Sequence, residues 1–118
     1  MKYAMLIYPK PGSHEGLAEE DAKALTAEYV ALRADSRCLG GAHLQPGDMA
    51  TTVRHGGSGN LITDGPYADA KEVLGGYYVF DASNLDEVLE VAQRIPAIRL
   101  GGAVEVRPLF EIAVETAH

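Results

Sequence analysis

The spacing of apolar and polar positions predicts a succession of strands and helices. Tyr3–Tyr8 is a short, almost wholly apolar run that ends at Pro9, and it predicts a buried strand. From Leu17 to Asp35 apolar residues return every three or four positions, as on one face of a helix. We expect this helix to begin near Ser13 or His14 and to carry its acidic residues in the first turn.

The middle of the chain is rich in β-forming residues interrupted by glycine. Cys38–Gln45 predicts a second strand, which stops before Pro46-Gly47. Met49–Arg54 and Asn60–Thr63 flank a glycine-rich connection, residues 55–59, and this arrangement is typical of a β-hairpin. The sequence Asp64-Gly65-Pro66 then ends the ladder.

The last third predicts a strand, a helix and a final strand. Leu74–Asp81 is a strand, and Asn84, with Glu87 three residues later, begins a capped helix that ends before Pro96. Val104–Phe110 is a strand whose Pro108 indicates a strand end or a sheet edge. The order β-α-β-β-β-α-β predicts an α+β fold, a ferredoxin-like sandwich with one antiparallel sheet and two helices on one face.

Two of these strands are apolar on both sides. In the first strand and in Leu74–Asp81, neighbouring positions that point to opposite faces are all apolar or aromatic: Tyr3, Met5 and Ile7 against Ala4, Leu6 and Tyr8, and Tyr78 and Phe80 against Tyr77 and Val79. Two helices cover only one face of such a sheet. We therefore expect a homodimer that forms through the open sheet face.

Length and charge narrow the classes of function. The 118 residues fit a single domain, 1–118, and the net charge is −7. Scattered cations on an acidic chain argue against nucleic acid and anionic membranes as partners. One cysteine, Cys38, excludes an internal disulfide, and the apolar run Tyr3–Tyr8 is too short for a signal segment or a membrane span. A cytoplasmic location is the resulting expectation.

Polar groups gather around a forced bend in Thr63–Gly76. Asp64 precedes Gly65-Pro66, and Lys71 and Glu72 return the chain toward the next strand. An acid, an ammonium and a second acid at one strand junction form a candidate set for proton transfer or anion binding. The alternative is structural, because aspartate before Gly-Pro is a common turn former.

Several other side chains are weaker candidates. Arg107 shares a sheet face with Glu105, so it either orients a substrate carboxylate or forms an ion pair. Tyr67 is among the tyrosines that either line a pocket or belong to the core. One interpretation of His43 and His55 is a pair that faces across the hairpin, but two imidazoles without a third ligand make a weak metal site. The favoured interpretation is an edge histidine and a turn histidine, and no metal or cofactor is expected.

The whole string TDGPYADAKEVLGGYYVFD resembles the signature of the DGPF branch of the YCII-related family. Asp64, Gly65 and Pro66 match the name-giving residues, and Tyr67 stands where the family has Phe. The rest of the pattern is met by Asp69, Lys71, Glu72, Gly75 and Gly76. The segments KYAMLIY, LQP, ATTVR and GAVEVRPLFE are also similar, so the resemblance covers nearly the whole chain in order.

The resemblance implies a ferredoxin-like fold that forms a dimeric α+β barrel. The wider group is linked to an active site built on a His-Asp pair, includes a chloromuconolactone dehalogenase, and is related in fold to muconolactone isomerase. DGPF members are often encoded beside extracytoplasmic-function sigma factors. The wider group's histidine lies on the first helix, where this chain has Glu28 and Tyr29 instead, so the resemblance carries over only Asp64.

Two functions therefore remain open from the sequence. The first is a cofactor-free enzyme that acts on a small anionic organic molecule by proton abstraction or elimination. Asp64 is its acid or base, with Lys71, Glu72 and Arg107 around it as substrate-binding groups; Arg107 or Lys71 holds the anion, and Tyr67 forms part of the pocket wall. The alternative is a non-catalytic module that binds a ligand or a protein and is linked to sigma-factor regulation. The sequence also leaves open a purely structural dimer, in which the signature serves the fold and the interface.

Overall fold

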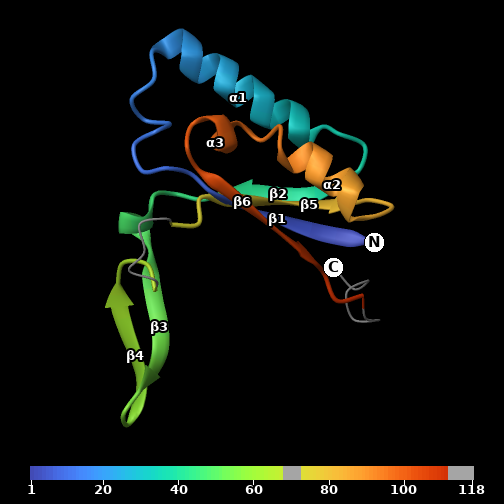
Figure 1. The fold of residues 1–118 in the computed structure, drawn as a ribbon. Coiled ribbons are helices and arrows are strands. Elements are labelled where there is room, and N and C mark those ends of the chain that lie inside the picture. The colour runs from blue at the N-terminus through green and yellow to red at the C-terminus, as the bar shows by residue number, and fades with distance from the viewer. Residues whose placement is uncertain (68–72, 112–118) are drawn as a thin grey trace.

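The computed structural model describes residues 1–67 and 73–111 (Figure 1). In chain order the elements are β1 (Lys2–Tyr8), α1 (Glu19–Arg33), β2 (Cys38–His43), the 3₁₀ turn η1 (Gly47–Met49), β3 (Thr51–Gly56), β4 (Gly59–Asp64), β5 (Gly76–Asp81), α2 (Leu85–Ala92), α3 (Pro96–Arg99) and β6 (Ala103–Pro108).

Four strands form an antiparallel sheet in the order β2-β5-β1-β6, and the helices lie on one face of it (Figure 1). This confirms the predicted ferredoxin-like α+β fold. The central strands are β1 and β5, the two with apolar residues on both sides. The edge strand β6 ends at Pro108, in agreement with the expectation of a strand end or a sheet edge.

The core lies between the sheet and the helices. On β1 the residues Tyr3, Met5 and Ile7 are buried, and on β5 Tyr78 and Phe80 are buried beside them. They pack with apolar residues from the helices and the segments that follow them: Leu32, Val88, Val91, Ala92, Ile95 and Ala97. Desolvation of its half-buried hydroxyl, which donates to the carbonyl of Tyr29 at 2.8 Å, raises the pKa of Tyr78 to about 12.

Among residues 1–67 and 73–111, no helix covers the opposite face of the sheet. It carries Ala4, Leu6, Tyr8 and Val79, which are half-buried, and Tyr77, which is 37% exposed. The register places Arg107 beside Ala4 and Glu105 beside Leu6 on this same face. We call this surface the open face, and its composition agrees with the two-sided apolar pattern of the sequence.

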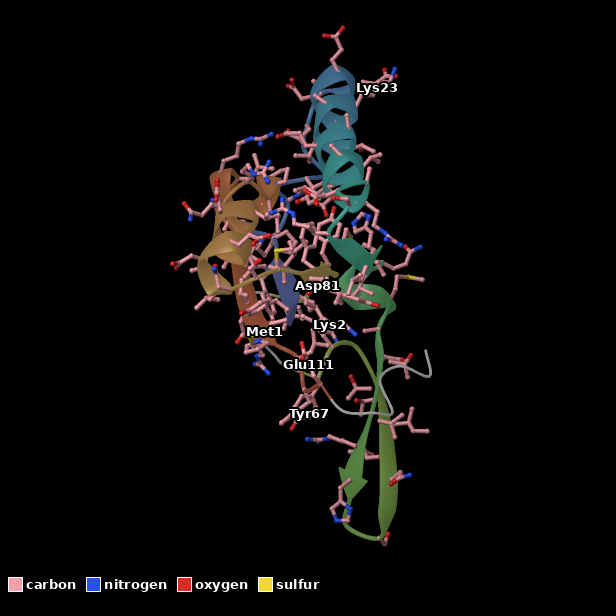
Figure 2. All side chains as sticks on the ribbon, turned by 90° about the vertical axis from the view of Figure 1, so that its right-hand side faces the viewer. Met1, Lys2, Lys23, Tyr67, Asp81 and Glu111 are labelled. Carbon is pink, nitrogen blue, oxygen red and sulfur yellow. The ribbon has the colours of Figure 1, made fainter. Side chains whose placement is uncertain are left out.

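The hairpin does not join the main sheet. Strands β3 and β4 pair with each other in a separate two-stranded sheet, which corrects the expectation of a single sheet. The reason is that both edges of β5 are already occupied, by β1 and β2, while the connection from Leu44 to Ala50 leads the chain away. The hairpin leaves one end of the sheet and points away from the helices (Figures 1 and 2).

The first helix starts later than expected. It begins at Glu19, its N-cap is Ala18, and no side chain caps it. Ser13 and His14 belong instead to the preceding turns, where His14 is directed at Tyr29 of the helix. The pattern missed this start because Leu17 and Ala18 continue the apolar spacing without being helical.

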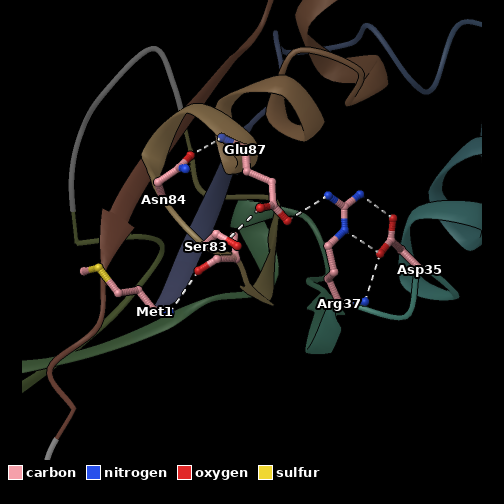
Figure 3. A network of polar contacts seen from close by, with 7 residues as sticks. Met1, Asp35, Arg37, Ser83, Asn84 and Glu87 are labelled. Carbon is pink, nitrogen blue, oxygen red and sulfur yellow. Dashed lines mark hydrogen bonds and ion pairs between the residues drawn. The ribbon is translucent and has the colours of Figure 1, made fainter.

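The second helix begins as predicted. The side chain of Asn84 accepts a hydrogen bond from the N–H of Glu87 at 2.9 Å, and the Glu87 carboxylate accepts one from the N–H of Ser83 (Figure 3). The same carboxylate binds Arg37, whose guanidinium also holds Asp35. Hydrogen bonds from Arg37 lower the pKa of Asp35 to about 2. This network joins the turn after α1 to the start of α2.

Candidate functional site

A pocket of about 470 Å³ lies at the end of the sheet where β1 and β2 finish. Its lining comes from three parts of the chain: the end of β1, the connection between β2 and β3, and the described flanks of residues 68–72. The lining residues are Tyr8, Leu44, Gln45, Pro46, Gly47, Met49, Ala50, Pro66, Tyr67, Val73 and Leu74. The described ends of the signature stretch therefore form one wall of the pocket.

Backbone hydrogen bonds fix this wall on both sides. Gly65 has φ of 98°, a value that favours glycine, and its N–H donates to the carbonyl of Ala50 at 2.8 Å. The hydroxyl of Thr52 donates to the carbonyl of Gly65 at 2.7 Å. At the other end the N–H of Gly75 donates to Ile7, and a Cβ at Gly75 would stand 2.8 Å from a ring carbon of Pro9. The glycines of the signature thus hold the stretch against the sheet.

The pocket wall is mainly apolar, with two phenolic rings and one amide. Tyr8 and Tyr67 supply the rings and Gln45 the amide. Met49 is 69% exposed and Tyr67 is 77% exposed, so the pocket opens widely to solvent in the single chain. Tyr67, labelled in Figure 2, lies on the same side of the molecule as the hairpin. Such a wall suits a small molecule with a flat apolar body and a few polar groups.

Asp64 does not line this pocket. It is the last residue of β4, it pairs with Thr51 across the hairpin, and it is exposed. Its side chain shares a hairpin face with Val53 and Ile62, because paired residues two apart lie on one side. Its role as an acid or base stays a prediction.

The predicted site residues Lys71, Glu72 and Arg107 are not seen together at the pocket. Lys71 and Glu72 lie outside the described residues. Arg107 is on the open face, and Glu105 accepts hydrogen bonds from its guanidinium at 3.1 Å, so the ion pair is the alternative observed in the single chain. Since Ala103 pairs with Tyr8 and Arg107 with Ala4, Arg107 is four strand positions, about 13 Å, from the pocket end.

The structure adds a hydrogen-bonded chain that the sequence did not reveal. Nδ1 of His14 lies 2.8 Å from the hydroxyl oxygen of Ser13, and Nε2 lies 3.0 Å from the hydroxyl oxygen of Tyr29 on α1. Burial lowers the pKa of His14. The charge of Glu15 raises this pKa, and the charge of His43 lowers it further, but burial has the largest effect. Burial likewise raises the pKa of Tyr29. The imidazole of His14, in the loop before α1, therefore contacts the side chain of Tyr29 on that helix.

His43 and His55 lie on different sheets. His43 ends β2 in the main sheet, whereas His55 pairs with Asn60 near the tip of the hairpin. Within residues 1–67 and 73–111, no three His, Cys, Asp or Glu side chains gather as a metal site would need.

Three comparisons place the chain among known proteins. The profile of the YCII-related domain matches residues 1–113. The chain belongs to the YCII-related family. An uncharacterised protein from Rhizobium meliloti (strain 1021) is 33% identical over 114 residues, which are 92% of each chain.

A solved structure shares the fold of this YCII-related protein. It is 5-chloro-2-hydroxyhydroquinone dehydrochlorinase (TftG) from Burkholderia phenoliruptrix, in complex with 2,5-dihydroxybenzoquinone. The TM-score is 0.51 and the sequence identity 20%, over 93% of this chain and 94% of that one. Among the described helices, none has the length and apolar character needed to cross a membrane.

Proposed function

We propose that this YCII-related protein binds a small organic molecule in the pocket and acts on it by acid/base chemistry without a cofactor. The observation that carries the proposal is the pocket itself, because the described ends of the signature stretch form its wall. Its volume of about 470 Å³ falls in the usual range of small-molecule sites. TftG is a dehydrochlorinase, and its solved complex with 2,5-dihydroxybenzoquinone supports this class of ligand.

Two groups are candidates for the proton transfer. Asp64 is the acid or base expected from the family signature, and in the chain it lies two residues before Pro66, which lines the pocket. His14, which is not among the pocket-lining residues, is the second candidate, because its contacts with Ser13 and Tyr29 orient the ring and burial lowers its pKa. Substitution of each side chain in turn distinguishes the two.

We propose an anionic substrate whose ring stacks on Tyr67 at the pocket wall. Arg107 or Lys71 keeps the role expected from the sequence, as the cation that holds the anion, and Glu72 keeps its expected place among the substrate-binding groups around Asp64. For Arg107 this role requires the open face, because the side chain lies there beside Glu105 and is 67% exposed.

We further propose that the protein is a cytoplasmic homodimer that forms through the open face. Half-buried Leu6, Tyr8 and Val79 give this face an apolar centre, and burying that surface is favourable. The free thiol of Cys38 suits a reducing compartment.

The test uses 2,5-dihydroxybenzoquinone as the probe, titrated by calorimetry. Ala50→Phe is expected to fill the pocket and weaken binding at least about tenfold. Ala27→Phe, on the exposed side of α1, is the matched control and is expected to leave binding unchanged. Equal binding by wild type and Ala50→Phe would place the ligand elsewhere and overturn the proposal.

Catalysis is tested separately with chlorinated hydroquinones, by following chloride release in the wild type. The variants Asp64→Asn and His14→Gln are expected to show which of the two side chains transfers the proton. Loss of turnover with retained probe binding identifies the catalytic group, and Asp48→Asn, a change at an exposed carboxylate near the pocket, is the control. Probe binding without turnover by any of these proteins favours the alternative function, a non-catalytic binding module linked to sigma-factor regulation.

A further inference from the structure

The β3–β4 hairpin, Thr51–Asp64, is a feature that the proposed chemistry does not use. We call it the arm. Every residue of β4 is exposed, and in β3 only Thr52 and Gly56 are partly covered. A two-stranded hairpin alone is at best marginally stable in water, so an arm of this kind needs a surface to pack on.

The arm presents an apolar pair on one side. Val53 and Ile62 are direct cross-strand partners, so their side chains lie together, and they are 60% and 66% exposed. Both are β-branched residues, which favour a pleated surface that is packed against another layer. The exposed pair therefore indicates a contact that the single chain leaves unmade.

The position of the arm determines what it meets. It points away from the helices, on the side of the sheet that carries the open face (Figure 1). A second sheet packed on that face would lie about 10 Å below the first, whereas six residues of strand reach about 20 Å. A second copy on the open face would thus lie beside the arm along much of its length.

The area of the open face leads to the same partner. Four strands about 4.8 Å apart and six residues long present about 400 Å², whereas a stable interface buries about 800 Å² on each partner. One side of the arm adds about 200 Å², and the surface that receives the other copy's arm adds about as much. The open face, the arm and the surface that receives the other arm together present about 800 Å² on each copy, the usual area of a stable interface.

The distribution of charge also favours a second copy. Between Thr51 and Asp64 the chain has one cation, Arg54, and one anion, Asp64, so the arm carries no net charge while the protein carries −7. An uncharged arm approaches a second acidic copy without the repulsion that its other surfaces would meet.

We propose that the arm packs its Val53–Ile62 side on a second copy of this chain, and that this copy completes the pocket. The inference rests on the homodimer proposed above. In a two-fold symmetric dimer each arm packs on the other copy, so no arm is left exposed and no further copies are added. Tyr8 belongs both to the open face and to the pocket wall, so a copy seated on that face covers the open side of the pocket.

The first test is the double variant Val53→Ser with Ile62→Ser, compared with wild type by sedimentation equilibrium. Loss of two apolar contacts on each of two arms is expected to raise the dimer dissociation constant about 100-fold or more. Val30→Ser is the control, since Val30 is also 60% exposed but lies on α1. Circular dichroism and an amide spectrum confirm that the core stays folded.

The second test does not depend on weakening the arm. A nitroxide on Ser58→Cys, in a Cys38→Ser background, is mixed with ¹⁵N-labelled copies without the nitroxide. Broadening of amide signals in the labelled copy is expected, because the partner's arm lies against it. A dimer without such broadening, or a protein that stays monomeric, overturns the inference.

The probe titration separates this inference from the proposed function. Weakening of the dimer by the arm variant with no binding of 2,5-dihydroxybenzoquinone to wild type supports the arm and overturns the function. If the wild type binds the probe but the arm variant dimerises as tightly as the wild type, the proposed function is supported and the inference about the arm is overturned. If both hold, the arm variant is also expected to bind the probe more weakly at concentrations where it is monomeric.

Discussion

Replacing Leu6 by alanine is expected to weaken the homodimer about 30-fold. Leu6 lies near the centre of the open face, between Tyr77 on β5 and Glu105 on β6. Full burial of a leucine side chain contributes about 1.5–3 kcal/mol, and about half of this is already realised in the half-buried single chain. About 1 kcal/mol remains for each copy, hence about 2 kcal/mol for a dimer, and about 1.4 kcal/mol corresponds to a factor of ten.

The assay is sedimentation equilibrium over a range of concentrations, with circular dichroism to show that the variant is folded. Leu85→Ala is the matched control, because Leu85 is 47% exposed at the start of α2 and lies off the open face. Leu6→Glu should act more strongly, since it would bury a carboxylate beside Glu105. A dissociation constant for Leu6→Ala within a factor of about three of wild type would refute the open face as the interface.

Three further predictions follow from the polar network, the loop histidine and the core. Arg37→Met should raise the pKa of Asp35 from about 2 toward its usual value, as followed by carboxyl NMR, and a pKa that stays near 2 would assign the shift to another cause. With Arg37 present, this carboxylate stabilises the fold above about pH 4 and loses that effect as the pH falls through about 2. The lowered pKa of His14 means that the unfolded chain takes up the proton first, so stability in urea should decline as the pH falls below about 6.5. His14→Gln should flatten this slope, and an unchanged slope would contradict the assignment. Phe80→Ala should cost about 3–5 kcal/mol of unfolding free energy, because the ring is fully buried, whereas Phe110→Ala, at an 86% exposed position, should cost under about 0.5 kcal/mol and serves as control.

The elements that could be predicted are those whose signal is local. The apolar runs in β1 and β5 defined both strands and their two buried sides, and the glycine-rich connection defined the hairpin. The cap at Asn84 was also predictable, because its partner is three residues away. In each case the residues that determine the structure lie within one turn or one strand of each other.

What the sequence did not reveal depends on contacts between distant segments. His14 and Tyr29 are 15 residues apart, and they meet only because the loop before α1 turns back on the helix. The pocket combines residues near positions 8, 44–50, 66–67 and 73–74, so no single stretch of sequence reveals it. The turn at Asp64 was recognised from its local chemistry, but the direction of its side chain depends on the separate pairing of the hairpin.

The placement of the hairpin links assembly to ligand binding. The arm lies between β2 and β5 in the chain, and residues that flank it on either side, Ala50 and Pro66, line the pocket at the same end of the sheet. If a second copy completes the pocket, a ligand must bind the dimer more tightly than the monomer. Thermodynamic linkage then requires the reverse effect, because the factor by which dimerisation tightens the ligand is the factor by which each bound ligand tightens the dimer. Sedimentation with and without 2,5-dihydroxybenzoquinone should therefore show a lower dissociation constant in its presence, and an unchanged constant would mean that the pocket is complete within one chain.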